Sequence, residues 1–296
     1  MKEISLGTAY WGWSVSEKEA NEILNLFYAS GGRFVDSAFN YPISSKPKDL
    51  NKSFLILSNW IKRNEINDLK INYKIGSISN EHIPKNNTSE RYLRDQFNQA
   101  LDISSNNIYS IMIHWDNSRS LKKIYDTCLF LKEIQTSGLR IGLSGIKNPK
   151  MYLDSMSDLN FLPIDLQVKS NFVQSNLDHY KIFDSRRNRF WAYGISLGGL
   201  KIEYSNLKYS LAFSSSSSIN KKPIVTEFMK DKIYIAMQEY QLNSIYELSI
   251  ANAEQNDSLY GYIIGPSNSF QMKSILKFLH SLKLRNIANN KKSKIF

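Results

Sequence analysis

Short apolar segments alternate with stretches of helical periodicity along almost the whole chain, and this alternation constrains the fold more than any other feature. Eight apolar segments have the length of buried strands, at residues 4–9, 33–37, 69–75, 108–113, 141–144, 165–168, 190–194 and 260–264. Helical spacing recurs between and after them, at 17–30, 50–61, 91–101, 120–136, 150–156, 177–187 and 270–282. Because eight such units close parallel strands into a barrel, we predict a single α/β domain, a (β/α)8 TIM barrel, over residues 1–283.

The longest departure from the alternation lies between the seventh and eighth predicted strands. It contains the serine run Ser214–Ser218 and two further segments of helical periodicity, at 226–240 and 245–253. A serine run is typical of a mobile loop, and a lid over a binding site needs the same mobility. Both interpretations of the run stay open.

The chain is basic, with 38 Lys and Arg against 27 Asp and Glu and a formal net charge of +11. Nucleic-acid binding needs basic residues clustered on one surface. Here they are spread along the helical segments, with one local cluster at 291–294 in a basic C-terminal tail, 284–296. We therefore assign the charge to solvated surface and, second, to attraction of anionic small molecules, and we expect no nucleic-acid partner.

Cys128 is the only cysteine, so the sequence offers neither a disulfide framework nor a multi-cysteine metal site. No segment approaches the roughly 20 apolar residues that span a bilayer, and Met1 leads directly into a strand. We therefore predict a cytoplasmic protein with no membrane partner and no metal ion.

Four polar side chains stand at or just beyond the ends of three consecutive predicted strands. Asp36 lies near the end of the second strand and Tyr41 follows it, Lys74 lies near the end of the third, and His114 directly follows the fourth. Each alone has an ordinary explanation, as a helix cap, a surface cation or a core histidine. Because barrels gather their catalytic residues at this rim, the coincidence favours a catalytic site.

This set of residues suits the reduction of a carbonyl group. A carbonyl that accepts hydride develops negative charge on oxygen, and Tyr41 can supply the proton that neutralises it. An ammonium group at Lys74 would favour the phenolate and so lower a phenol pKa that is ordinarily about 10. Asp36 would hold Lys74 charged and in place, and His114 would orient the carbonyl by a hydrogen bond.

The same strand ends carry short motifs in a fixed order. They are Gly7-Thr8, FVDSAFNY at 34–41, Lys74, IHWD at 113–116, GLS at 142–144, DLQ at 165–167, AYGISLGGL at 192–200 and IIGPSNSFQM at 263–272. Each is unspecific by itself. As an ordered series on these strands, through about residue 282, they resemble the aldo-keto reductase superfamily.

The resemblance implies a nicotinamide cofactor, NADPH with NADH as the alternative, bound across the barrel mouth without a Rossmann domain. None of the 13 glycines forms the G-x-G-x-x-G turn of that domain. By the same likeness Ser144 and Gln167 hold the carboxamide, and Tyr193 stacks on the nicotinamide ring. Helix-start amides would bind the pyrophosphate. The other implied cofactor residues are Gly7, Thr8, Leu200, Gly265, Ser267, Asn268 and Gln271.

Three positions depart from the family pattern. Gly145 stands where an Asn commonly follows the carboxamide-binding Ser, so one side-chain hydrogen bond is lost. The final loop lacks the Arg that often binds the 2′-phosphate of NADP, with Lys273 as a possible substitute. The residues after Tyr41, at 42–45, also differ, which makes the substrate loop distinct.

Aromatic residues surround the expected site and indicate the substrate. They are Tyr10, Trp11, Trp13, Phe39 and Trp115. Aromatic faces suit sugar rings and the basic surface suits phosphate, so a keto-sugar or a nucleotide-linked sugar is the candidate substrate, although some of these rings can equally belong to the core.

Two functions remain for this pattern. The first is an NAD(P)H-dependent oxidoreductase that reduces a small-molecule aldehyde or ketone to an alcohol, with Tyr41 as the proton donor. The second is a cofactor-binding redox-sensing or regulatory subunit with the same fold and little catalysis. The intact set of four polar residues favours the first, while Gly145 and the altered final loop keep the second open.

Overall fold

The computed structural model describes residues 1–81, 85–184, 186–203, 206–208 and 227–285 of the 296-residue chain. Eight parallel strands form a closed barrel in the order β1-β10-β7-β6-β5-β4-β3-β2. They are β1 (Glu3–Gly7), β2 (Phe34–Ala38), β3 (Lys70–Ile75), β4 (Ile108–His114), β5 (Arg140–Ser144), β6 (Asp165–Lys169), β7 (Arg189–Tyr193) and β10 (Gly261–Ile264). Each predicted strand lies within two residues of an observed one, so the predicted (β/α)8 fold is confirmed.

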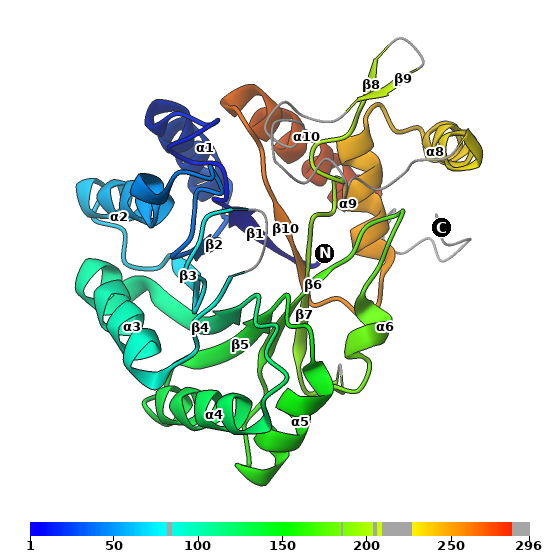
Figure 1. Cartoon of the computed structure of the whole chain (residues 1–296). Helices are drawn as coiled ribbons and strands as arrows, with labels where there is room; N and C mark the ends of the chain where they lie inside the picture. The colour runs from blue at the N-terminus through cyan, green and yellow to red at the C-terminus, as the bar shows by residue number, and fades with distance from the viewer. Residues whose placement is uncertain (82–84, 185, 204–205, 209–226, 286–296) are drawn as a thin grey trace.

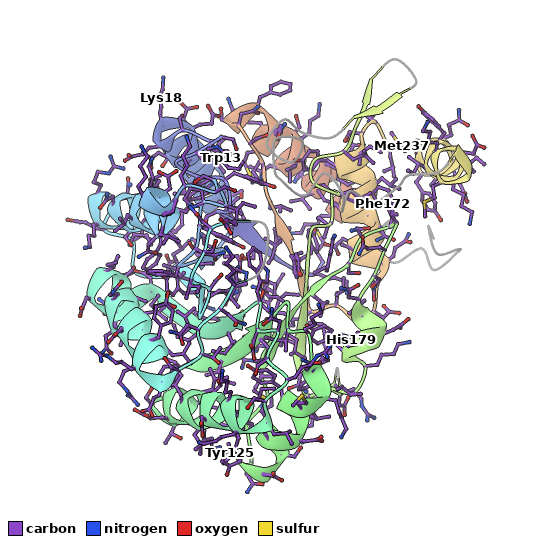
Figure 2. All side chains as sticks on the ribbon, viewed as in Figure 1. Trp13, Lys18, Tyr125, Phe172, His179 and Met237 are labelled. Atoms are coloured by element: carbon purple, nitrogen blue, oxygen red, sulfur yellow. The ribbon has the colours of Figure 1, made fainter. Side chains whose placement is uncertain are left out.

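Helices surround the barrel, as Figure 1 shows. They are α1 (Glu17–Ala29), α2 (Lys52–Arg63), α3 (Glu90–Ser104), α4 (Leu121–Thr136), α5 (Pro149–Asp158), α6 (Leu177–Tyr180) and α10 (Ser269–Arg285). Local signals place their starts: the Ser16 hydroxyl accepts from the Glu19 amide (3.2 Å) before α1, and Ser120 caps α4 in the same way. Figure 2 shows Tyr125 on the outer side of α4, whose inner face carries buried Cys128.

The segment before β7 differs from its prediction. A helix was expected over 177–187, but α6 ends at Tyr180. The Asp184 carboxylate accepts from the Arg186 amide (2.9 Å), and the Asp184 carbonyl accepts from the Asn188 amide (2.9 Å). Because an aspartate that bonds to nearby backbone competes with helical hydrogen bonds, the chain turns here into β7.

The excursion between β7 and β10 holds the short antiparallel pair β8 (Lys201–Glu203) and β9 (Asn206–Lys208), which was not predicted, and two helices. Helices α8 (Glu227–Glu239) and α9 (Ile245–Gln255) match the two predicted segments. Figure 1 shows the hairpin and α8 at the periphery beside α9. The run Ser214–Ser218 and residues 286–296 of the basic tail lie outside the described residues.

Strand register brings the expected site residues side by side. Ala38 pairs with Lys74, two positions beyond Asp36 on β2. On the neighbouring strands His114 pairs with Ser144, and Ser144 with Gln167. Asp36 and Gln167 lie at the middle of their strands and the others at or next to the carboxyl ends, so the parallel topology directs all of them to the same half of the barrel.

Two further properties of the described residues bear on the sequence analysis. None of their helices combines the length and apolar character needed to cross a bilayer. Nor do they include three or more His, Cys, Asp or Glu side chains grouped to hold a metal ion.

Candidate active site

A cavity of about 580 Å³ opens at the carboxyl end of the barrel. Its volume falls in the range of small-molecule and cofactor sites. Twelve of the residues proposed from the sequence line it: Gly7, Asp36, Tyr41, Lys74, His114, Ser144, Gln167, Tyr193, Gly265, Ser267, Asn268 and Gln271. These twelve residues make up a little under half of the cavity wall.

A continuous chain of hydrogen bonds forms the floor of the cavity. The ammonium of Lys74 donates to Oδ2 of Asp36, and both side chains are almost fully buried. Nε2 of Gln167 donates to the other carboxylate oxygen of Asp36 (2.5 Å), and the Ser144 hydroxyl donates to Oε1 of Gln167 (2.9 Å). The carboxylate thus receives charged and neutral donors together, which is what a buried charge requires.

Tyr41 lies above this pair with its ring toward the ammonium. Nζ of Lys74 is 4.9 Å from the ring centroid. Burial, together with the negative charge of Asp36, raises the pKa of Tyr41 well above its ordinary value. The expected net lowering of the Tyr41 pKa is therefore wrong, because desolvation of the phenolate and the Asp36 charge outweigh the ammonium of Lys74. Tyr41 is a neutral phenol that holds a proton to give.

His114 is buried at the end of β4, and its ring makes an edge contact with Tyr41 at 5.8 Å between centroids. Burial and the nearby Lys74 ammonium hold the pKa of His114 well below its usual range. Nδ1 of His114 lies 3.0 Å from Oδ1 of Asn40, a fully buried residue that the sequence analysis did not single out. The imidazole is accordingly neutral and fixed in orientation.

The side chain of Trp115 fills the space that a side chain at position 145 would need. Its φ is +65°, and a Cβ placed there would lie 2.7 Å from Cδ1 of Trp115. Trp115 itself has a φ of +58°. Its backbone amide donates a hydrogen bond to the Ser144 carbonyl (2.8 Å), and its backbone carbonyl accepts one from Nδ2 of Asn86 (3.1 Å). Strained backbone of this kind is characteristic of functional sites. Trp115 can take its observed position only because residue 145 has no side chain.

Two expected cofactor residues lie off the cavity wall. Thr8 is fully buried and its hydroxyl donates to Ser37 (3.0 Å). Leu200 instead lines an adjoining cavity of about 300 Å³, which shares Tyr246 and Gln271 with the main one. Four further wall residues were not proposed from the sequence: Ser14 and Ile43 lie on loops, Lys169 ends β6, and Tyr246 lies in the first turn of α9.

The start of α10 departs from the expected anion site. The Ser269 amide donates to the Glu19 carboxylate, and the Gln271 amide donates to Oδ1 of Asn268 (2.8 Å). The Ser267 amide donates in turn to Oε1 of Gln271 (2.9 Å). These amides are satisfied within the protein, and a carboxylate already stands at the positive end of the helix.

The aromatic residues near the rim divide into two groups. Tyr10 and Trp115 line the cavity. Trp11 is buried in the core, Trp13 packs on Tyr10 at 5.9 Å between ring centroids, and Phe39 packs against the core. Two of the five rings therefore lie on the cavity wall, and the other three pack elsewhere, as the second interpretation of these aromatic residues allowed.

A buried phenol, an ion-paired lysine and a neutral imidazole lie together on one cavity wall, a combination of groups that can donate and accept hydrogen bonds and hold a proton. The model of the aldo/keto reductase family matches residues 3–291, and the chain belongs to that family. Membership supports an oxidoreductase activity with a nicotinamide cofactor.

A solved structure shares the architecture. The glycerol dehydrogenase from Gluconobacter oxydans is similar with a TM-score of 0.69 and 14% identity, covering 96% of this chain and 90% of that chain. At this identity the likeness shows the fold alone. No curated protein matches the sequence.

Proposed function

We propose that the protein is an NAD(P)H-dependent reductase of a small-molecule aldehyde or ketone, with Tyr41 as the proton donor. The observation that carries the proposal is the position of the neutral Tyr41 phenol on the cavity wall, above the Asp36–Lys74 pair. The bound cofactor supplies a hydride to the carbonyl carbon. The protein then has to bind the carbonyl oxygen and protonate it.

Each of the other polar residues has a distinct part in this proposal. The Tyr41 hydroxyl donates to the carbonyl oxygen and transfers its proton as negative charge develops, since an alkoxide is a stronger base than a phenolate. Lys74 supplies a fixed positive charge beneath the ring of Tyr41, which stabilises the phenolate left behind. Asp36 keeps that ammonium charged despite its burial.

The cavity fits a nicotinamide cofactor at its inner end. Ser144 and Gln167 present a hydroxyl and a side-chain amide side by side, suited to a carboxamide, and Tyr193 presents a ring on the same wall. Gly265 leaves open space where a Cβ would stand, so a ligand can approach the backbone there.

We assign the adenosine end of the cofactor to the adjoining cavity that Leu200 lines, and this end favours NADH over NADPH, in contrast to the NADPH preference that the family resemblance implies. Glu19 occupies the start of α10, and Glu247 lines the adjoining cavity. Among the described residues that line this second cavity none is a Lys or Arg, and Lys273 is exposed outside it. A 2′-phosphate would meet negative charge without a cation to balance it.

Substitution of Tyr41 by Phe tests the mechanism. Steady-state reduction of a panel of aldehydes and ketones by Tyr41→Phe is expected to fall at least about 100-fold, because general acid catalysis contributes about 10²–10⁴-fold. Cofactor binding, followed by fluorescence, should stay within about threefold of wild type. Full activity of this variant with normal cofactor binding would contradict the role of Tyr41.

The regulatory alternative needs a separate measurement. Rapid mixing of the cofactor-loaded wild-type protein with the carbonyl panel should oxidise the cofactor in a single turnover. A protein that binds cofactor but oxidises it with none of these carbonyls would favour the sensing role instead.

A further inference from the structure

Asn40 connects the proposed catalytic histidine to the loop after β3. It directly precedes Tyr41, and its side chain is fully buried. Nδ2 of Asn40 donates to the backbone carbonyl of Ser79 (3.2 Å), and Oδ1 lies 3.0 Å from Nδ1 of His114. Because only the nitrogen of the amide can donate to a carbonyl, the bond to Ser79 directs the oxygen of Asn40 toward the imidazole.

This orientation sets the tautomer of His114. An amide oxygen can only accept a hydrogen bond, so Nδ1 of His114 carries the proton. The ring is neutral, since burial and Lys74 hold the pKa of His114 well below its usual range. Its other nitrogen, Nε2, therefore has a lone pair, and within the described ranges no protein group is found bonded to it. The ring lines the cavity.

We infer that Asn40 makes His114 a hydrogen-bond acceptor toward the substrate, and that the enzyme therefore selects carbonyl compounds with a hydroxyl group on the neighbouring carbon. An unprotonated Nε2 has no hydrogen to donate, and its lone pair repels a carbonyl oxygen. His114 therefore does not orient the carbonyl group, in contrast to the role expected from the sequence. A hydroxyl group can donate to Nε2. This inference rests on the proposed function and names its substrate class.

The geometry lets one small molecule meet both groups. The rings of Tyr41 and His114 are 5.8 Å apart, edge to face, on the same cavity wall. A carbonyl oxygen that accepts from the Tyr41 hydroxyl leaves the adjacent hydroxyl of the same molecule free to donate to His114. Asn40 is a positioning residue in this arrangement, because it acts on the substrate only through the imidazole.

Nitrogen NMR of the uniformly ¹⁵N-labelled, full-length protein tests the tautomer without any turnover. Two-bond correlations between ring protons and ring nitrogens distinguish the two neutral tautomers, and His114→Gln identifies the His114 signals among the four histidines. We expect a protonated Nδ1 and an unprotonated Nε2 that persist from about pH 6 to pH 8. A proton on Nε2 in the wild type would overturn the inference.

Matched ketones test the substrate class. Hydroxyacetone and butanone differ by a hydroxyl in place of a methyl group, and kcat/KM should favour hydroxyacetone by about 10- to 100-fold. Methoxyacetone and 2-pentanone form the control pair, because a methoxy oxygen accepts but cannot donate. Their kcat/KM values should agree within about threefold. A methoxyacetone advantage as large as that of hydroxyacetone would show a donating His114 and overturn the inference.

Two variants of Asn40 separate positioning from packing. Asn40→Asp keeps an acceptor for Nδ1, and we expect it to retain both the tautomer and the preference for hydroxyacetone. Asn40→Leu removes the acceptor, and its preference should fall to within about threefold of unity while the turnover of butanone persists. An unchanged preference in Asn40→Leu would overturn the inference. If that variant does not fold, the wild-type spectrum and Asn40→Asp decide the question.

The outcomes separate this inference from the proposed function. Failure of the wild type to reduce any ketone or aldehyde would remove the proposed function, and the inferred substrate class with it. A reductase that is active but carries its His114 proton on Nε2 would remove the inference and leave the proposed function standing.

Discussion

The ammonium of Lys74 lies against the ring of Tyr41, 4.9 Å from its centroid, and is also ion-paired with Asp36. The ammonium thus faces the aromatic ring of Tyr41, and the carboxylate of Asp36 balances most of its charge before any reaction begins. Stabilisation of a phenolate by Lys74 is therefore small in the resting site and grows as the proton leaves. This arrangement keeps Tyr41 protonated and ready to donate.

The pH dependence of the two reaction directions follows from the raised pKa of Tyr41. Reduction needs the protonated phenol, which persists until pH approaches that raised pKa, so kcat for reduction should stay level from about pH 6 to pH 9. Alcohol oxidation needs the deprotonated phenol, and its rate should rise about tenfold per pH unit over the same range. Stopped-flow traces in both directions measure this. A decline of reduction centred near pH 7 would contradict it.

Removal of only one charge of the buried Asp36–Lys74 pair should strongly lower the free energy of unfolding. Asp36→Asn leaves Lys74 buried without a counter-charge and should lower the free energy of unfolding by about 3–5 kcal/mol in urea titrations. The double variant Asp36→Asn, Lys74→Met removes both charges and should recover most of that loss.

The exposed pair Lys122–Asp126 is the matched control for this experiment. Lys122→Ala should change the free energy of unfolding by no more than about 0.5 kcal/mol. Equal effects of the buried and the exposed single variants would show that burial of the Lys74 charge does not determine stability.

The sequence predicted the barrel well because each strand is a short apolar run between turn residues, a signal that is local in the chain. It also predicted the wall residues at strand ends, because parallel strands bring those ends to one rim. Helix 177–187 was overpredicted, since the competing Asp184 turn depends on one side-chain hydrogen bond that periodicity does not show.

Properties that depend on neighbours distant in sequence could not be predicted. The sign of the Tyr41 pKa shift results from desolvation by surrounding residues, and a lysine at a strand end suggests the opposite sign. The role of Asn40 depends on contacts with His114, 74 positions away, and with the Ser79 carbonyl. The sequence showed only that position 145 lacks a side chain, and it could not show that Trp115 lies in the space which that side chain would fill.

Restoring a side chain at position 145 should disturb Trp115. Asn tolerates a positive φ better than other residues with a Cβ, so the cost of Gly145→Asn should come mainly from the contact with Trp115 and reach about 1–3 kcal/mol. Combining it with Trp115→Ala should remove more than half of that cost in a double-mutant cycle of unfolding free energies.

Gly31→Asn is the control for backbone strain at position 145. Gly31 has a φ of +92° with open space where a Cβ would stand, so the substitution adds strain without a clash. Its cost should be clearly smaller than that of Gly145→Asn. Similar costs at the two positions, or an unchanged cost in the Trp115→Ala background, would contradict the coupling.

Cofactor preference should follow the carboxylates at the adenosine end. Fluorescence titrations are expected to show NADH bound about tenfold more tightly than NADPH, a difference of about 1.4 kcal/mol. Glu247→Gln keeps an acceptor for the Asn243 amide (2.6 Å) but removes the charge, and it should improve NADPH affinity about threefold with little effect on NADH.

The remote Asp158→Asn on α5 provides the same charge change away from the cavity. It should alter neither affinity. Tighter binding of NADPH than NADH to the wild type would contradict the assignment of the adjoining cavity to the adenosine end.

Arg140 and Asp165 form an ion pair at the opposite end of the barrel, where the strands β5 and β6 begin, and this pair should serve stability alone. Nε and Nη2 of Arg140 donate to the two carboxylate oxygens of the fully buried Asp165 (2.8 and 3.0 Å). Arg140→Ala leaves that carboxylate buried and unpaired, and it should lower the free energy of unfolding by about 3 kcal/mol. Arg140→Lys keeps the charge but not the paired donors, so its cost should be intermediate.

The kcat of the folded fraction of both variants should match the wild type, because the pair does not line the cavity. A loss of kcat beyond about tenfold in fully folded Arg140→Lys would show that this end of the barrel takes part in the reaction.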